Sequence, residues 1–204
     1  MSIVLASGSP RRRELLEMML GQGGFEIAAA SAEEEPSGTA PDETVMSVAE
    51  GKARAVAAGR PPEDVVIAAD TLVFLDGRRL GKPESEEHAV SMLTSLSGRT
   101  HQVYTGVCVM NPGGRTICRA ERTDVTFRSF TKEEAETYVK TGEPMDKAGA
   151  YGIQGRGSVL VERINGDYFN VVGLPMCLLY GMLKQFGIEL LGYTNRDRHG
   201  KIDH

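Results

Sequence analysis

Short apolar runs alternate with amphipathic stretches along most of this chain, with polar turns between them. Apolar runs of strand length lie at 2–6, 25–30, 65–75, 99–110, 115–127, 157–164 and 167–172. Stretches with helical spacing of apolar positions lie at 11–20, 41–58, 85–96, 131–140 and 174–186. Helices interspersed with strands, some joined by tight turns, predict an α/β fold with a mixed central sheet flanked by helices.

Local signals indicate where several of these elements begin or turn. Asn111-Pro112-Gly113-Gly114 predicts a hairpin between the two longest strands. We expect Asn165-Gly166 to join the last two strands as a pair. Ser85 predicts the start of one helix, and the capping box that begins at Thr131 predicts the start of another.

The apolar run at 65–75 is interrupted at its centre by Asp70 and Thr71. A carboxylate in a core is costly, so it normally pairs with a cation, binds a metal or shifts its pKa. One interpretation is that the strand ends at Ala69 and Asp70 caps a turn. The other is that the strand is broken here because Asp70 has a function. Gly81-Lys82-Pro83 places a lysine just beyond the next turn.

Composition and charge narrow the class of protein. The chain has 204 residues, 41% of them apolar and 25% charged, which is typical of one folded domain. We expect that domain at 1–190 and a polar tail at 191–204. The net charge of −5 argues against a nucleic-acid-binding surface. No apolar run approaches the roughly 18 residues that a membrane-spanning helix requires, so no membrane contact is expected.

The cysteines give a further indication. Cys108, Cys118 and Cys177 fit neither a disulfide framework nor a zinc-binding spacing. Such thiols are typical small core residues in a reducing compartment. We therefore expect a cytoplasmic protein.

The segment LASGSPRRR at 5–13 combines a strand, a turn of small residues and a helix start. A helix N-terminus presents free N–H groups and partial positive charge, which suits a phosphate. Arg11 and Arg12 add bidentate donors for phosphate oxygens. The alternative is a solvated helix face, since no Walker pattern is present.

Lys52 is the unusual residue of the helix at 41–58. It falls on the same stripe as Val45 and Val48, so it is expected to face inward. Its ammonium could simply reach solvent, but Asp70 and the acidic run at 33–35 need cationic or metal partners. Carboxylates without a cysteine and histidine set favour Mg²⁺ or Mn²⁺. The alternative for the acidic run is a solvated loop.

The stretch DKAGAYGIQGRG at 146–157 is rich in glycine but is a weak match to a dinucleotide-binding fingerprint. It could bring backbone and Gln154 close to a ligand. It could equally be an ordinary turn between a helix and a strand.

Together these segments resemble the Maf nucleotide pyrophosphatases, a family named after an inhibitor of septum formation. Eight motifs carry the resemblance in order, and their number and spacing make a chance match improbable. They are LASGSPRR at 5–12, Glu33-Glu34, EGKARAV at 50–56, AADT at 68–71, LGKP at 80–83, SGRTHQVYTGV at 97–107, DKAGAYGIQG at 146–155 and ING-Y-VVGLP within 164–175.

The resemblance implies a mixed sheet with two lobes around a cleft, often in a homodimer. It implies cleavage of a nucleoside triphosphate between the α and β phosphates, with a divalent metal, to give the monophosphate and pyrophosphate. It further implies that Asp70 is the proton acceptor and that three residues set base specificity: Arg11, Thr71 and Gln154.

The remaining implied roles concern phosphate and metal. Glu33 and Asp70 would hold Mg²⁺ or Mn²⁺. Four residues would line the phosphate part of the cleft: Ser9, Arg12, Lys52 and Lys82.

Within the family, Ala69-Asp70-Thr71 and GIQG at 152–155 resemble the dTTP/UTP branch. The branch that acts on 7-methyl-GTP has a sequence similar to SDQ at the first of these sites and a serine–glutamate pair at the second. Gln154 can offer both an N–H and a carbonyl to a pyrimidine 2,4-dione. The alternatives are a nucleotide-sensing regulator of cell division without turnover, a 7-methyl-GTP pyrophosphatase and a phosphatase that releases orthophosphate.

Overall fold

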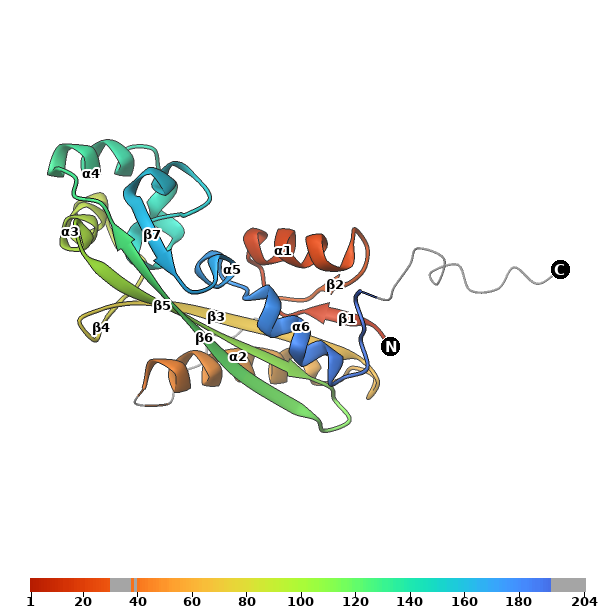
Figure 1. Cartoon of the computed structure of the whole chain (residues 1–204). Helices are drawn as coiled ribbons and strands as arrows, with labels where there is room; N and C mark the ends of the chain where they lie inside the picture. The colour runs from red at the N-terminus through yellow and green to blue at the C-terminus, as the bar shows by residue number, and fades with distance from the viewer. Residues whose placement is uncertain (30–37, 39, 192–204) are drawn as a thin grey trace.

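A computed structural model describes residues 1–29, 38 and 40–191, and these form a mixed α/β structure (Figure 1). One seven-stranded sheet has the order β2-β1-β3-β5-β6-β7, with β4 paired to β3. β1 is parallel to β2 and β3, and the other pairs are antiparallel. The predicted fold class is therefore confirmed. The strands are β1 (Ile3–Leu5), β2 (Glu26–Ile27), β3 (Val65–Leu75), β4 (Arg78–Leu80), β5 (Thr100–Met110), β6 (Thr116–Phe127) and β7 (Val161–Asn165).

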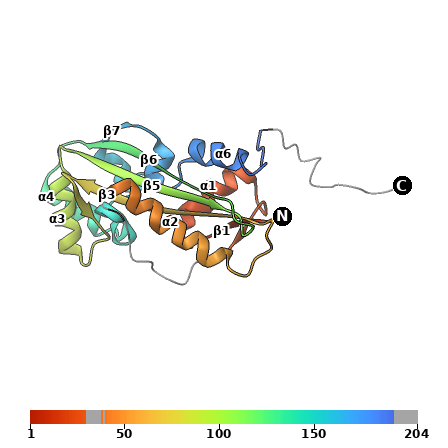
Figure 2. The same ribbon diagram turned by 90° about the horizontal axis from the view of Figure 1, so that it is seen from below.

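Helices cover both faces of the sheet. α2 packs along β3 and β5 on one face (Figure 2), and α1, α5 and α6 lie on the other (Figure 1). No helix in the described residues is long and apolar enough to cross a bilayer. The helices are α1 (Pro10–Leu20), α2 (Pro41–Ala57), α3 (Glu86–Leu96), α4 (Lys132–Val139), α5 (Tyr168–Val172) and α6 (Met176–Lys184), with 3₁₀ turns η1 (Glu143–Asp146), η2 (Ala148–Ala150) and η3 (Arg156–Leu160).

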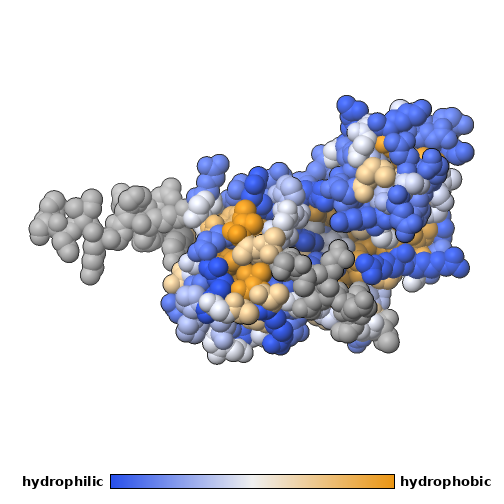
Figure 3. All heavy atoms as spheres, turned by 180° about the vertical axis from the view of Figure 1, so that it is seen from behind, coloured by the Kyte–Doolittle hydropathy of each residue, from blue (hydrophilic) through white to orange (hydrophobic). Residues whose placement is uncertain are grey.

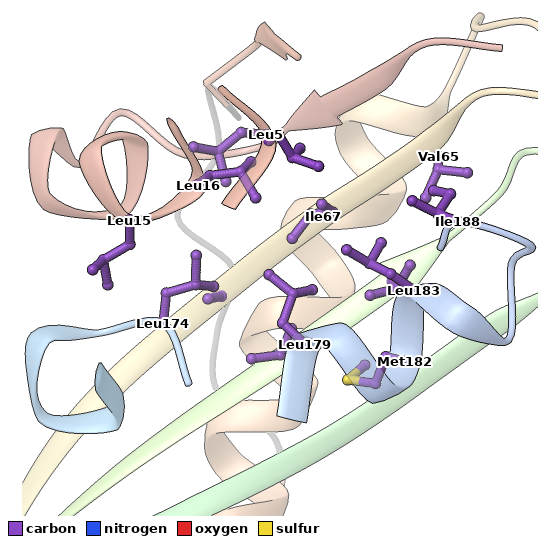
Figure 4. Close-up of a cluster of buried hydrophobic side chains, with 14 of the residues drawn as sticks. Leu5, Leu15, Leu16, Val65, Ile67, Leu174, Leu179, Met182, Leu183 and Ile188 are labelled. Atoms are coloured by element: carbon purple, nitrogen blue, oxygen red, sulfur yellow. The ribbon is translucent and has the colours of Figure 1, made fainter. Parts of the chain in front are cut away.

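The core follows the alternation of side chains along β3. Ile67 and Ala69 pack with α1 and α6 in one apolar cluster (Figure 4). Val66 and Ala68 pack with α2 in another. Because successive side chains of a strand point to opposite faces, Asp70 and Thr71 leave β3 on opposite sides of the sheet.

β3 itself is continuous, which corrects the expectation of a break at Asp70. Its register with β5 runs without interruption from Val66↔Met110 to Phe74↔Gln102. The pairing is interrupted on the other edge of β3, where the neighbouring strands are β1 and β4. β1 pairs with β3 only as far as Ile67, and β4 pairs only from Val73. The middle of β3 therefore has a bare edge, here defined as residues 68–72.

The observed ends of the helices and strands show which local sequence signals predicted them correctly. The hairpin at 111–114, the Ser85 cap and the Thr131 capping box are confirmed. The predicted strand at 167–172 is wrong, because Tyr168–Val172 is helix α5. Asp167 caps it by accepting a hydrogen bond from the Phe169 N–H (2.8 Å), and an apolar run this short fits either structure.

The two ends of the molecule differ in their surfaces. Hydrophilic side chains dominate the end that carries α3 and α4, whereas the largest apolar patch in this view lies at the end that carries α1 and β1 (Figure 3). Exposed Met18 and Ile27 belong to this second end.

Gly106 permits the close approach of α2 to the sheet. A Cβ at this position would lie 2.6 Å from the Met46 nitrogen and would overlap the Val45 carbonyl. Gly106 is the register partner of Asp70, so this contact fixes the depth at which α2 lies beside the bare edge.

We expect Gly106→Ala to lower the free energy of unfolding by about 1–3 kcal/mol, because backbone atoms of α2 must move. Urea denaturation measures the change. Gly181→Ala is the matched control: Gly181 lies inside α6 with no atom within 4 Å of its added Cβ. It should be neutral or stabilise by up to about 1 kcal/mol. Equal stability of the two variants would contradict the close α2 contact.

Candidate functional site

A cavity of about 680 Å³ lies against the bare edge of β3. One wall is the turn before α1, and another is the glycine-rich loop after η2. Of the nine residues predicted for the site, eight line this cavity; the ninth, Glu33, lies outside the described residues. The eight are Ser9, Arg11, Arg12, Lys52, Asp70, Thr71, Lys82 and Gln154.

The turn before α1 is built to end a strand and start a helix. Pro10 occupies the first helical position, and Ser9 caps the helix by accepting a hydrogen bond from the Arg12 N–H (3.5 Å). Ser7 Oγ accepts from the Ser9 N–H (3.2 Å). The N-terminal end of α1 therefore borders the cavity with its partial positive charge, which favours an anion there.

Arg12 ties α1 to the middle of the sheet and to the end of α5. Its Nε donates to the Gly173 carbonyl (2.9 Å), and its Nη2 donates to Thr71 Oγ1 (3.1 Å). Burial lowers the pKa of Arg12 from its ordinary value, and the nearby Asp70 carboxylate opposes that shift. A guanidinium remains charged under these conditions, so Arg12 supplies a fixed positive charge to the cavity.

The Thr71 hydroxyl belongs to a chain of hydrogen bonds with a defined direction. Thr105 Oγ1 donates to the Asn170 carbonyl (2.9 Å). Thr105 therefore has no second proton for Thr71, whose Oγ1 lies 2.9 Å away. Thr71 must donate to Thr105 while it accepts from Arg12. Its hydroxyl proton is thus already used, and the hydroxyl holds Arg12 in place.

Asn170 anchors this chain in the core. Its Nδ2 donates to the Val103 carbonyl (3.0 Å) and to Thr123 Oγ1 (2.9 Å). Asn170, Thr105 and Thr123 are each fully buried. Neither Asn170 nor Thr105 was predicted from the sequence; the one signal for each was a polar side chain inside an apolar segment.

Asp70 and Lys52 form an ion pair across the other face of β3. Lys52 Nζ lies 2.6 Å from Asp70 Oδ1, and the two side chains are only 24% and 18% exposed. The expectation that Asp70 needs a cationic partner is therefore met by Lys52, whose ammonium faces inward. Asp70 Oδ2 has no partner among the described residues, which leaves one carboxylate oxygen for a water or a metal.

The bare edge adds main-chain groups to the cavity. On this side of β3 the Ala6 N–H donates to the Ile67 carbonyl (2.7 Å). Alternate residues of a strand direct their N–H and C=O groups to the same side. Ala69 and Thr71 therefore direct theirs into the gap between β1 and β4.

Asp146, at the end of η1, links α1 to the turn after η1. Asp146 Oδ2 lies 3.4 Å from Arg11 Nη1, and Asp146 Oδ1 lies 2.6 Å from Lys147 Nζ. This exposed bridge joins the two sides of the cavity. Lys82 pairs with none of the described carboxylates, so its ammonium is available to an anion.

The predicted metal ligands are Asp70 and Glu33. Among the described residues, no group of three or more histidine, cysteine, aspartate and glutamate side chains could hold an ion. Asp70 is a suitable oxygen ligand, since carboxylates are preferred by Mg²⁺ and Mn²⁺. Glu33 lies outside the described residues.

Comparison with known proteins places this geometry in context. The family model described as Maf-like protein matches residues 2–186. The dTTP/UTP pyrophosphatase of Bacillus cereus strain G9842 is 50% identical over 92% of this chain and 97% of that protein. The dTTP/UTP pyrophosphatase of Bacillus mycoides strain KBAB4 is 51% identical over the same shares. The HAM1 protein of Coxiella burnetii matches with a TM-score of 0.51, 15% identity and coverage of 91% and 99% of the two chains, which shows a shared fold.

We expect Thr105→Val to lower the free energy of unfolding by about 1–3 kcal/mol, because it leaves the Thr71 hydroxyl and the Asn170 carbonyl without their partner. It should also weaken triphosphate binding, since Arg12 loses its fixed support. Urea denaturation and isothermal titration measure the two effects.

Thr100→Val is the matched control on the same strand. Thr100 Oγ1 pairs with Thr126 Oγ1 at 2.9 Å, but on the exposed surface. This variant should stay within about 0.5 kcal/mol of the wild type and keep its affinity. A Thr105→Val protein with unchanged stability would show that the directed chain of hydrogen bonds contributes nothing.

Proposed function

The chain belongs to the Maf family, and on that premise we propose that it hydrolyses dTTP and UTP to the nucleoside monophosphate and pyrophosphate. One observation carries the proposal. A half-buried carboxylate, Asp70, lies at the bare edge of β3 in the same cavity as Arg12, Lys52 and Lys82. A carboxylate close to several cations suits attack of water on a highly anionic substrate.

We propose that the cations bind the triphosphate. The N-terminus of α1 and the side chains of Arg12, Lys52 and Lys82 would neutralise phosphate charge, and such preorganised positive groups supply most of the acceleration in phosphoryl transfer. Ser9 contributes by capping α1 at this end. Lys52 then has two alternative partners, the Asp70 carboxylate and a phosphate oxygen.

Asp70 is proposed as the proton acceptor. Water attacks the α-phosphorus in line with the leaving pyrophosphate, and its proton passes to the Asp70 carboxylate. When Lys52 turns to the phosphate, the Asp70 carboxylate is released from its ion pair and is free to accept the proton. Bound Mg²⁺ or Mn²⁺, held by Asp70 and Glu33, would neutralise further charge on the phosphates.

Base selection is assigned to three residues: Gln154, Thr71 and Arg11. Gln154 is exposed to the cavity and can offer a donor and an acceptor to the O4 and N3–H edge of a pyrimidine dione. Thr71 contributes main-chain groups at the bare edge rather than its hydroxyl. Arg11 is positioned by Asp146 to reach the same region.

The alternative functions predict different results when substrates and products are measured. A nucleotide-sensing regulator would bind without turnover, a phosphatase would release orthophosphate, and a 7-methyl-GTP pyrophosphatase would prefer that nucleotide. The names of the relatives favour dTTP and UTP, and the four site residues Asp70, Thr71, Lys52 and Gln154 are compatible with that choice.

The test measures pyrophosphate release and kcat/KM for dTTP, UTP, CTP, the purine triphosphates and 7-methyl-GTP, with Mg²⁺ and with excess chelator. We expect dTTP and UTP to be preferred over CTP by several powers of ten, because cytosine presents a donor where the dione presents an acceptor. Chelator should abolish turnover without unfolding the chain. Equal rates for CTP and UTP, or release of orthophosphate, would refute the proposal.

Asp70→Asn tests the proposed acceptor. We expect kcat to fall by roughly 10²–10⁴, the range for loss of a positioned base. Asp76→Asn is the control, since Asp76 pairs with Arg99 at an exposed turn outside the cavity. Near-normal turnover by a folded Asp70→Asn protein would remove Asp70 from this role.

A further inference from the structure

Glu143 lies under the loop that carries Gln154, and its carboxylate is held by three hydrogen bonds. Oε1 accepts from the Tyr138 hydroxyl (2.8 Å) and the Gly157 N–H (3.1 Å). Oε2 accepts from the Arg156 N–H (2.8 Å). Two of the three donors are main-chain groups of the segment just after Gln154, so Glu143 is bonded to that segment's backbone.

Tyr138 ties the other end of the same loop. Its hydroxyl donates to Glu143 and accepts from the Gly152 N–H (3.0 Å). Burial raises the pKa of Tyr138 above its ordinary value, so the hydroxyl keeps the proton that it donates. Residues 152–157 are therefore fixed on both sides of Gln154, whose own side chain bonds to no described residue.

The glycines of this loop are explained by its closeness to Glu143 and Tyr138. A Cβ at Gly155 would lie 2.6 Å from Glu143 Oε1 and would overlap Oε2. A Cβ at Gly157 would lie 2.6 Å from the Tyr138 hydroxyl. The loop thus lies directly on these two side chains, and a shift of either would move the backbone that bears Gln154.

We propose that Glu143 is a positioning residue for base selection: it sets the height and direction of Gln154 over the cavity by holding the backbone on its C-terminal side. The proposal rests on the proposed function, in which Gln154 reads the base. Glu143 also lines the cavity, so the same residue both supports the loop and borders the space proposed for the nucleotide.

The negative charge of Glu143 is part of this role. Burial raises the pKa of its carboxyl, but the bonds from Gly157, Arg156 and Tyr138 and the nearby charge of Lys147 together outweigh it, and the pKa lies below its ordinary value. The carboxylate is therefore ionised at neutral pH and accepts from all three donors. A neutral amide has only one accepting oxygen, and its NH₂ group would face an N–H donor.

Glu143→Gln is the main test. We expect kcat/KM for UTP to fall by about 10–100-fold, chiefly through KM, while CTP changes by less than about threefold, so that the UTP to CTP ratio drops at least tenfold. A merely structural role would lower the melting temperature and reduce both substrates equally, which would overturn the proposal.

Two further variants sharpen the test. Gly155→Ala leaves Gln154 and Glu143 chemically intact but forces them apart, so it should reproduce the loss of the UTP to CTP ratio. Glu134→Gln is the matched control: Glu134 accepts from the Thr131 N–H (3.0 Å) and Arg128 Nη2 (2.7 Å) in the neighbouring capping box, outside the cavity. It should leave the ratio unchanged. An unchanged ratio in Gly155→Ala would count against the proposal.

The outcomes separate this inference from the proposed function. If the wild type fails to release pyrophosphate from UTP or shows no preference over CTP, the proposed function fails before Glu143 is tested. If the wild type prefers UTP and Glu143→Gln keeps that preference, only the positioning role fails. Selectivity that is lost in Gln154→Ala but kept in Glu143→Gln would likewise refute the positioning role alone.

Discussion

The structure depends on an unequal pairing of β3. One edge of this strand is paired with β5 along its length, whereas the other is paired with β1 at one end and with β4 at the other. An unpaired edge inside a sheet leaves main-chain groups without partners, which is costly unless something else binds there. The cavity occupies this gap, and Asp70 and Thr71 project from it to opposite faces. Helices on both faces can thus contribute to one site: Lys52 from α2 and Arg12 from α1.

Much of the fold could be predicted because local signals sufficed. Pro10, Ser85, the Thr131 capping box and the turn at 111–114 each act within a few residues of the structure that they determine. The error at 167–172 has the opposite cause. Periodicity cannot separate a strand from a helix in so short a run, and the contacts that decide it, such as Asn170 with Val103, join residues far apart in the sequence.

The residues of the candidate site likewise fall into those that could be predicted from the sequence and those that depend on long-range contacts. Asp70 and Lys52 were found because a charge in an apolar environment requires a partner wherever it lies. Thr105 and Asn170 carry no charge, and their importance appears only when β5 and α5 meet. Glu143 was missed because an exposed-looking glutamate after a glycine is common, and nothing in the sequence reveals that two backbone N–H groups 13 and 14 residues later point to it.

The bond from Arg12 to the Gly173 carbonyl joins positions 161 residues apart. A chain growing from its N-terminus acquires the start of α1 early, but it cannot fix Arg12 until α5 has emerged and folded. Nascent chains and fragments that end before this point hold the charged residues of the site without their geometry. The geometry around Arg12 can therefore form only late in synthesis, after α5 and Gly173 have been made.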